Sequence, residues 1–97
     1  MPTLDAGLHQ LDLFLRTYPV RVQKSVTLGG VPADYYCPLA GIAVLLVKGA
    51  RADARKPLLT KQGITVLTLK ASAIARNPDA VCAFLDAAIR HALTHEG

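Results

Sequence analysis

Positively charged side chains are concentrated in one stretch of this 97-residue sequence. Asp53 is the only acid between Lys48 and Arg76. The cations of the same stretch are Lys48, Arg51, Arg55, Lys56, Lys61, Lys70 and Arg76. Such an excess favours polyanions, nucleic acid first, because binding releases counterions from the phosphates. The alternative is an ordinary solvated surface in a chain of formal net charge +4.

Histidine and cysteine, the other residue types suited to chemistry, form no recognisable motif. His91 and His95 are spaced to share a helix face, but no third ligand or HExxH glutamate accompanies them. We expect surface histidines that interact favourably with a helix C-terminus. Cys37 and Cys82 lie far apart without a CxxC pair, which does not match a zinc site. Cys37 also lacks the histidine partner of a thiol nucleophile.

Composition indicates one globular domain spanning residues 1–97. Hydrophobic residues make up 52% of the chain and charged residues 19%, which separates it from disordered sequences. No apolar run reaches the ~18 residues of a membrane helix, and no signal-peptide pattern opens the chain. We therefore expect a cytoplasmic protein with no membrane partner. A chain this short could also gain stability as a homodimer that covers an edge strand.

Amphipathic helices are predicted at both ends. The first begins after Thr3, a suitable N-cap, and stops before Pro19. Its apolar stripe consists of Leu4, Leu8, Leu11, Phe14 and Leu15. The last opens at residues 77–79 (NPD), an N-cap followed by proline and an acid. Its expected buried face consists of Val81, Phe84, Leu85, Ala88, Ile89 and Leu93.

Strand patterns lie between these helices. Residues 20–28 alternate, Gly29 and Gly30 form a hairpin turn, and residues 31–37 supply the antiparallel partner. Residues 42–47 (IAVLLV) predict a strand buried on both faces, and residues 64–69 a further strand. A short helix interrupted by Pro57 and ending at Gly63 would connect these two strands, which should therefore be parallel. The predicted fold is α/β (α+β), in the order α-β-β-β-α-β-α, with a mixed four-stranded sheet flanked by helices.

Four short stretches carry a family resemblance. They are residues 20–23 (VRVQ), 34–38 (DYYCP), 63–67 (GITVL) and 77–81 (NPDAV). Together with the order of elements they resemble the PD-(D/E)XK restriction-endonuclease-like superfamily. They are similar in particular to its small Vsr-like branch, the domains related to very-short-patch-repair endonucleases, whose stretches read approximately FRRQ, DFYCP, a GYRVLR-like strand and P-x-x-V. The resemblance spans roughly residues 4–93.

The resemblance implies metal-dependent hydrolysis of a phosphodiester. Carboxylates on adjacent strands would hold Mg²⁺, and a lysine would assist the developing charge. It makes Asp34, Lys48 and Gln23 the vestigial catalytic candidates, with Asp34 as the metal ligand. The alternative for Asp34 is a side chain that caps the backbone of its own turn.

The strand that should carry the second acid is apolar. The family's E-x-D positions match Leu45 and Val47, and a one-residue shift matches Leu46-Val47-Lys48 with the D/E-x-K half motif. The carboxylate is missing in both registers, and the family's helix glutamate falls near Leu8. Asp53 could supply a migrated acid, but a local salt bridge with neighbouring cations is the simpler interpretation. If Asp34 met only Lys48, an ion pair would have replaced the metal site.

Three functions follow from these observations. The first is a catalytically degenerate nuclease-fold domain that binds nucleic acid, DNA rather than RNA, near the former active site. Its binding residues would be Lys48, Arg51, Arg55, Lys56 and Lys61. The second is an active endonuclease with a relocated or partner-supplied acid, which would need Mg²⁺. The third is a structural or oligomerisation module; the first and third require no cofactor.

Overall fold

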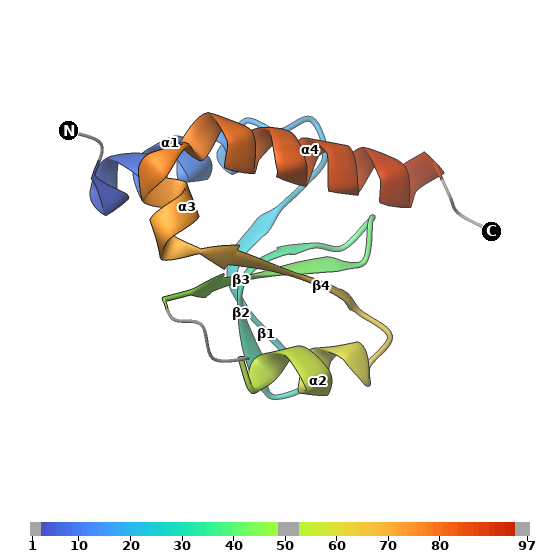
Figure 1. Cartoon of the computed structure of the whole chain (residues 1–97). Helices are drawn as coiled ribbons and strands as arrows, with labels where there is room; N and C mark the ends of the chain where they lie inside the picture. Colours follow the sequence, from blue (N-terminus) through green and yellow to red (C-terminus); the bar gives the residue numbers. More distant parts are fainter. Residues whose placement is uncertain (1–2, 49–52, 95–97) are drawn as a thin grey trace.

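The computed structural model describes residues 3–48 and 53–94, and these form an α+β fold with a mixed four-stranded sheet. In Figure 1 the helices α1, α3 and α4 cover one face of the sheet, and α2 covers the other. The elements are α1 (Leu4–Arg16), β1 (Gln23–Leu28), β2 (Val31–Cys37), β3 (Ile42–Val47), α2 (Arg55–Thr60), β4 (Thr65–Lys70), α3 (Ala71–Arg76) and α4 (Pro78–Thr94).

The hairpin of β1 and β2 and the parallel pair of β3 and β4 form as the sequence predicts. Their order in the sheet is β1-β2-β3-β4, in which β2 is antiparallel to both of its neighbours and β3 is parallel to β4. Gly29 and Gly30 have φ values of 57° and 82°, the left-handed conformation that a tight hairpin turn requires. The helix α2 supplies the connection between the two parallel strands.

Two element predictions need correction. A short helix, α3, lies between β4 and α4, so the order of elements contains one helix more than predicted. The first strand begins at Gln23 rather than Val20, because its partner β2 ends at Cys37 just before Pro38, which has no N–H to offer. Val20 and Val22 instead pack against the core from the connection that precedes β1.

The predicted helix caps are confirmed. The hydroxyl of Thr3 accepts a hydrogen bond from the backbone N–H of Ala6 at 3.1 Å. The side chain of Asn77 accepts one from Ala80 N–H, also at 3.1 Å. Each bond satisfies a donor that the first turn of a helix leaves unpaired, which stabilises the helix by about 1 kcal/mol.

The sheet separates two hydrophobic cores. The larger, the α1-side core, lies under α1, α3 and α4 and includes Leu11, Leu15, Tyr35, Val44, Leu69, Ile74, Leu85 and Ile89. The smaller, the α2-side core, consists of Val31, Ala33, Ala43, Leu45 and Leu59. Both cysteines belong to the α1-side core, and burial raises the pKa of the Cys82 thiol. Phe84, predicted to be buried, is 51% exposed on α4.

Close contacts hold α1 over the sheet. Gly7 is buried where α1 crosses α3, and a Cβ there would meet the carbonyl oxygen of Ile74. The hydroxyl of Tyr35 donates a hydrogen bond to Asp12 at 3.3 Å. Burial, together with the Asp12 carboxylate, raises the pKa of Tyr35 to about 12. These contacts fix α1 against α3 near its start and against β2 near its end.

None of the helices formed by the described residues is long and apolar enough to cross a membrane.

Candidate functional site

The side chains of β2 alternate between the two faces of the sheet, and this alternation shifts by one residue at Asp34. Ala33 packs in the α2-side core, whereas Tyr35, only two positions along, packs in the α1-side core. On β1, Ser25 lies between the pairs Lys24↔Tyr35 and Val26↔Ala33, opposite Asp34, and has a φ of 54°. Left-handed backbone is uncommon for serine. Both strands are therefore irregular at the position of the candidate acid.

The irregularity turns the Asp34 carboxylate toward β3. It accepts a hydrogen bond from the backbone N–H of Leu46 at 2.8 Å, beyond the last β2–β3 pair at Tyr35↔Val44. Asp34 therefore caps the backbone of a neighbouring strand, not that of its own turn. A carboxylate that accepts from a backbone N–H makes a stronger bond than a neutral acceptor would.

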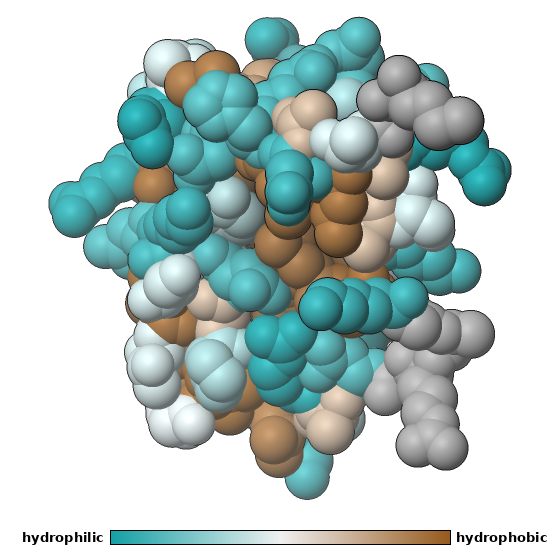
Figure 2. All heavy atoms as spheres, turned by 90° about the vertical axis from the view of Figure 1, so that its left-hand side faces the viewer, coloured by the Kyte–Doolittle hydropathy of each residue, from teal (hydrophilic) through white to brown (hydrophobic). Residues whose placement is uncertain are grey.

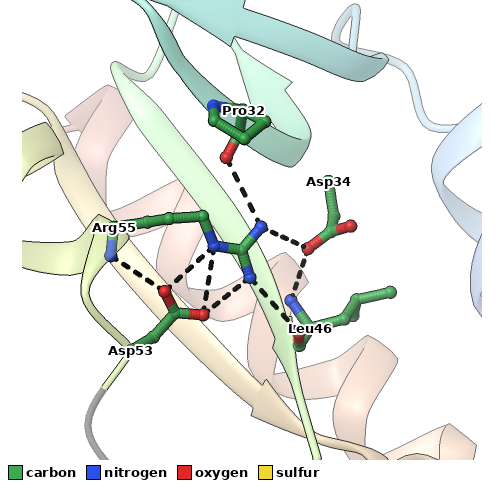
Figure 3. A network of polar contacts seen from close by, with 5 residues as sticks. All are labelled: Pro32, Asp34, Leu46, Asp53 and Arg55. Carbon is green, nitrogen blue, oxygen red and sulfur yellow. Dashed lines mark hydrogen bonds and ion pairs between the residues drawn. The ribbon is translucent and has the colours of Figure 1, made fainter.

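Arg55 joins Asp34 to Asp53, as Figure 3 shows. Its Nη1 lies 3.4 Å from Asp34 Oδ2, while its Nη2 lies 2.6 Å from Asp53 Oδ2. The guanidinium also donates to the carbonyl oxygens of Pro32 and Leu46, each at 3.4 Å. We call these five residues the Arg55 network. It connects the start of α2 to both β2 and β3.

The charges of the Arg55 network stabilise one another. Hydrogen bonds from Arg55 hold the pKa of the Asp53 carboxyl below its ordinary value, and Asp53 raises the pKa of Arg55 in return. The side chains of Asp53 and Arg55 are 15% and 26% exposed, so water screens the pair only in part. The expected local salt bridge of Asp53 is thus confirmed. The partner of Asp34 in this structure is Arg55, not Lys48.

A hollow of about 250 Å³ lies next to Asp34. Its lining consists of Leu4, Leu8, Asp34, Leu46, Val47, Lys48, Ala71 and Ile74. Figure 2 views the molecule from this side and shows apolar side chains exposed in the middle of the face, between hydrophilic ones. The hollow thus brings together Asp34, Lys48 and the apolar positions that the family resemblance aligns with acids.

The hollow distinguishes the two registers proposed for β3. Leu45 is fully buried in the α2-side core, on the other side of the sheet. Leu46 and Lys48 both line the hollow with Asp34. Val47 lines the hollow as well, so the Leu46-Val47-Lys48 register lies at the hollow throughout, whereas the register of Leu45 and Val47 places only Val47 there.

The donor atoms at this hollow do not fit a divalent cation. Mg²⁺ prefers several oxygen ligands, yet among the described residues Asp34 is the only carboxylate of the lining, and it already accepts hydrogen bonds from Leu46 N–H and Arg55. Within residues 3–48 and 53–94 no group of three or more histidine, cysteine, aspartate or glutamate side chains could hold a metal. Two oppositely charged residues and an apolar surface stand where the family resemblance implies a metal site.

The remaining predicted residues lie in different places. Lys48, at the end of β3, and Lys56 and Lys61, at α2, are exposed, and none has an ion-pair partner among the described residues. Gln23 opens β1 opposite Tyr36 and does not belong to the described lining of the hollow. Arg51 and His95 lie outside the described residues.

Sequence reasoning missed the bridging role of Arg55. Asp53 Oδ1 accepts a hydrogen bond from the backbone N–H of Arg55 at 2.9 Å, the turn that aspartate forms with a residue two positions on. An Asp-x-Arg pattern before a short helix was the available signal. The long-range contact with Asp34 had no local signal, because it depends on how β2 and β3 are placed in the sheet.

Neither a scan against protein-family models nor a search of curated proteins finds a match for this chain.

Proposed function

We propose that this chain is a restriction-endonuclease-like domain that has lost catalysis and binds nucleic acid, DNA rather than RNA. The order of β strands around the α2 crossover and the position of Asp34 beside Lys48 support the fold assignment. Lys48 at the hollow and the exposed lysines of α2, Lys56 and Lys61, would contact phosphates. Such contacts carry affinity without reading the base sequence.

One observation carries the proposal. The positions aligned with the family's metal site meet around one hollow, but Leu8 and Leu46 stand where the family has acids. The remaining acid, Asp34, shares the cation Arg55 with Asp53 and accepts a hydrogen bond from Leu46 N–H. With one carboxylate in the described lining instead of two or more, a phosphate meets less repulsion there than it would in a metal-free active nuclease.

The distribution of charge supports nucleic acid as the ligand. The acids Asp12, Asp34, Asp53 and Asp86 all take part in ion pairs. The cations Arg21, Lys48, Lys56, Lys61, Lys70 and Arg76 have no ion-pair partner among the described residues. Five of these six belong to the basic stretch between residues 48 and 76. Their charge is therefore available to an anionic partner.

The test is the salt dependence of duplex binding without divalent metal. The variant Lys48→Gln/Lys56→Gln/Lys61→Gln should lower the slope of log K against log salt by about 0.9 for each phosphate that the protein no longer neutralises. The control Arg16→Gln/Arg21→Gln/Arg90→Gln removes the same charge elsewhere on the surface. It should bind with nearly the wild-type slope. Equal reductions of the slope in both variants, or binding that ignores salt, would contradict the proposal.

Cleavage is the second readout. Supercoiled plasmid incubated with the protein and Mg²⁺ or Mn²⁺ should remain intact to the same extent as with Asp34→Ala. Cleavage by the wild type above that of the variant would show that an acid from elsewhere completes the site.

A further inference from the structure

The two edge strands of the sheet are built differently. On β1 the left-handed Ser25 interrupts pairing, and such an irregularity discourages a further strand from adding at that edge. On β4 every residue from Thr65 to Lys70 has a partner in β3, so the strand is regular throughout. Its other edge pairs with no strand of the described residues. The β4 edge is the one that could accept another strand.

The backbone groups at this edge can be identified. Thr65 N–H donates to Gly41 O at 2.9 Å and therefore points toward β3. Because the N–H and C=O of successive residues point to alternate sides of a strand, those of Val66, Thr68 and Lys70 point away from β3. An extended chain beside β4 would find donors at these three residues and acceptors at Val66 and Thr68, because the carbonyl of Lys70, the N-cap of α3, accepts the first hydrogen bond of that helix.

An apolar groove of about 460 Å³ adjoins the same edge. Leu69 and Val81 are buried residues of its lining, and Phe84 of α4 contributes a ring that is 51% exposed. Lys70 and Arg76 are exposed, also line the groove and have no ion-pair partner among the described residues. No acid lines the groove in the part of the chain that the structure describes. In Figure 1, α3 and α4 lie above β4.

We propose that the β4 edge and this groove bind an extended acidic peptide segment of a partner protein by strand addition. Backbone hydrogen bonds to Val66, Thr68 and Lys70 would hold the peptide in register. An apolar side chain would occupy the groove beside Phe84, and a carboxylate would meet Lys70 and Arg76. A second copy of the chain fits less well, because it would bring the same two cations and no acid to the interface.

Panning a random dodecapeptide library against the full chain tests the proposal. Enriched peptides should contain Asp or Glu near a β-branched or aromatic residue. On binding, the amide resonances of residues 65–70 should shift and gain protection from hydrogen exchange. The double variant Lys70→Glu/Arg76→Glu should bind these peptides about tenfold or more weakly.

Thr68→Pro removes one outward N–H without removing a bond of the β3–β4 ladder, since proline is tolerated at the free side of an edge strand. It should abolish peptide binding, whereas Thr68→Val should retain it; circular dichroism checks that both variants fold. If Thr68→Pro does not fold, Phe84→Ser with the charge-reversed double variant gives the same test. Thr68→Pro and Phe84→Ser change no cation, so their effect on peptide binding is separate from the result of duplex binding.

Three outcomes would overturn the proposal. The first is that no peptide is enriched, or that binding survives both Thr68→Pro and the charge reversal. The second is a concentration-dependent dimer, seen by sedimentation, that Thr68→Pro dissociates, which would assign the edge to a second copy. The third is that a single-stranded oligonucleotide binds in a way that requires Phe84 and Arg76, while no peptide binds.

Discussion

The Arg55 network and the exposed lysines Lys48, Lys56 and Lys61 use positive charge in opposite ways. Arg55 is 26% exposed and contacts two carboxylates and two carbonyl oxygens. Lys48, Lys56 and Lys61 are exposed and have no ion-pair partner among residues 3–48 and 53–94. The cations of the basic stretch therefore differ in their roles. Of its described cations, Arg55 connects α2 to the sheet, and the others are available to a ligand.

The largest effect on stability is expected from Arg55→Met. The variant keeps an unbranched side chain but leaves Asp34 and Asp53 without their shared cation. It should lower the free energy of unfolding by about 2 kcal/mol, since hydrogen bonds to charged groups are worth more than neutral ones. Urea denaturation measures it. Lys56→Met, the matched control one position along α2, should change stability by less than about 0.5 kcal/mol. Equal losses of unfolding free energy in the two variants would mean that Arg55 and the exposed lysines do not differ in their contribution to the fold.

Removal of Asp34 should have a smaller effect. Asp34→Ala leaves the Leu46 N–H without its acceptor and should destabilise by about 1 kcal/mol. Asp34→Asn keeps an oxygen that can accept the same bond and should destabilise less. The ranking, measured by thermal unfolding, separates the backbone cap from the ion pair. A destabilisation as large for asparagine as for alanine would mean that the charge alone matters.

Acid should weaken the network through Asp53. Because its pKa is lower in the folded state than in the unfolded chain, its contribution to stability is present above the ordinary pKa of aspartate. This contribution is lost as the pH falls through the lowered value. Denaturation at several acidic pH values should show a steeper loss for the wild type than for Asp53→Asn. Parallel curves would indicate that Arg55 does not act on Asp53.

The exposed lysines should show the smallest effect on stability and a clear effect on binding. Each of Lys48→Gln, Lys56→Gln and Lys61→Gln should unfold within about 0.5 kcal/mol of the wild type. Each should also reduce the salt slope of duplex binding by up to about 0.9. If one of these substitutions destabilised the fold without altering the salt slope, that lysine would have a structural role like that of Arg55.

Local patterns were enough to predict most of the elements. Alternation, the Gly29-Gly30 turn and the unbroken apolar run of β3 predicted the hairpin and the parallel pair, because these signals depend on neighbouring residues. The caps at Thr3 and Asn77 were predicted for the same reason. Phe84 was placed wrongly, since its spacing fits the apolar stripe of α4 while the sheet below does not extend far enough to cover it.

The sequence by itself determined that Leu46 and Val47 cannot bind a metal, because neither side chain has a donor atom in any arrangement. It also determined the excess of cations between residues 48 and 76. Only the tertiary structure decided that Leu46, Val47 and Lys48, and not Leu45, lie at the hollow with Asp34, and that Arg55, not Lys48, pairs with this acid. Both depend on the slip in β2 at Asp34 and on the approach of α2 to the sheet. These contacts join residues distant in sequence, and no local pattern specifies them.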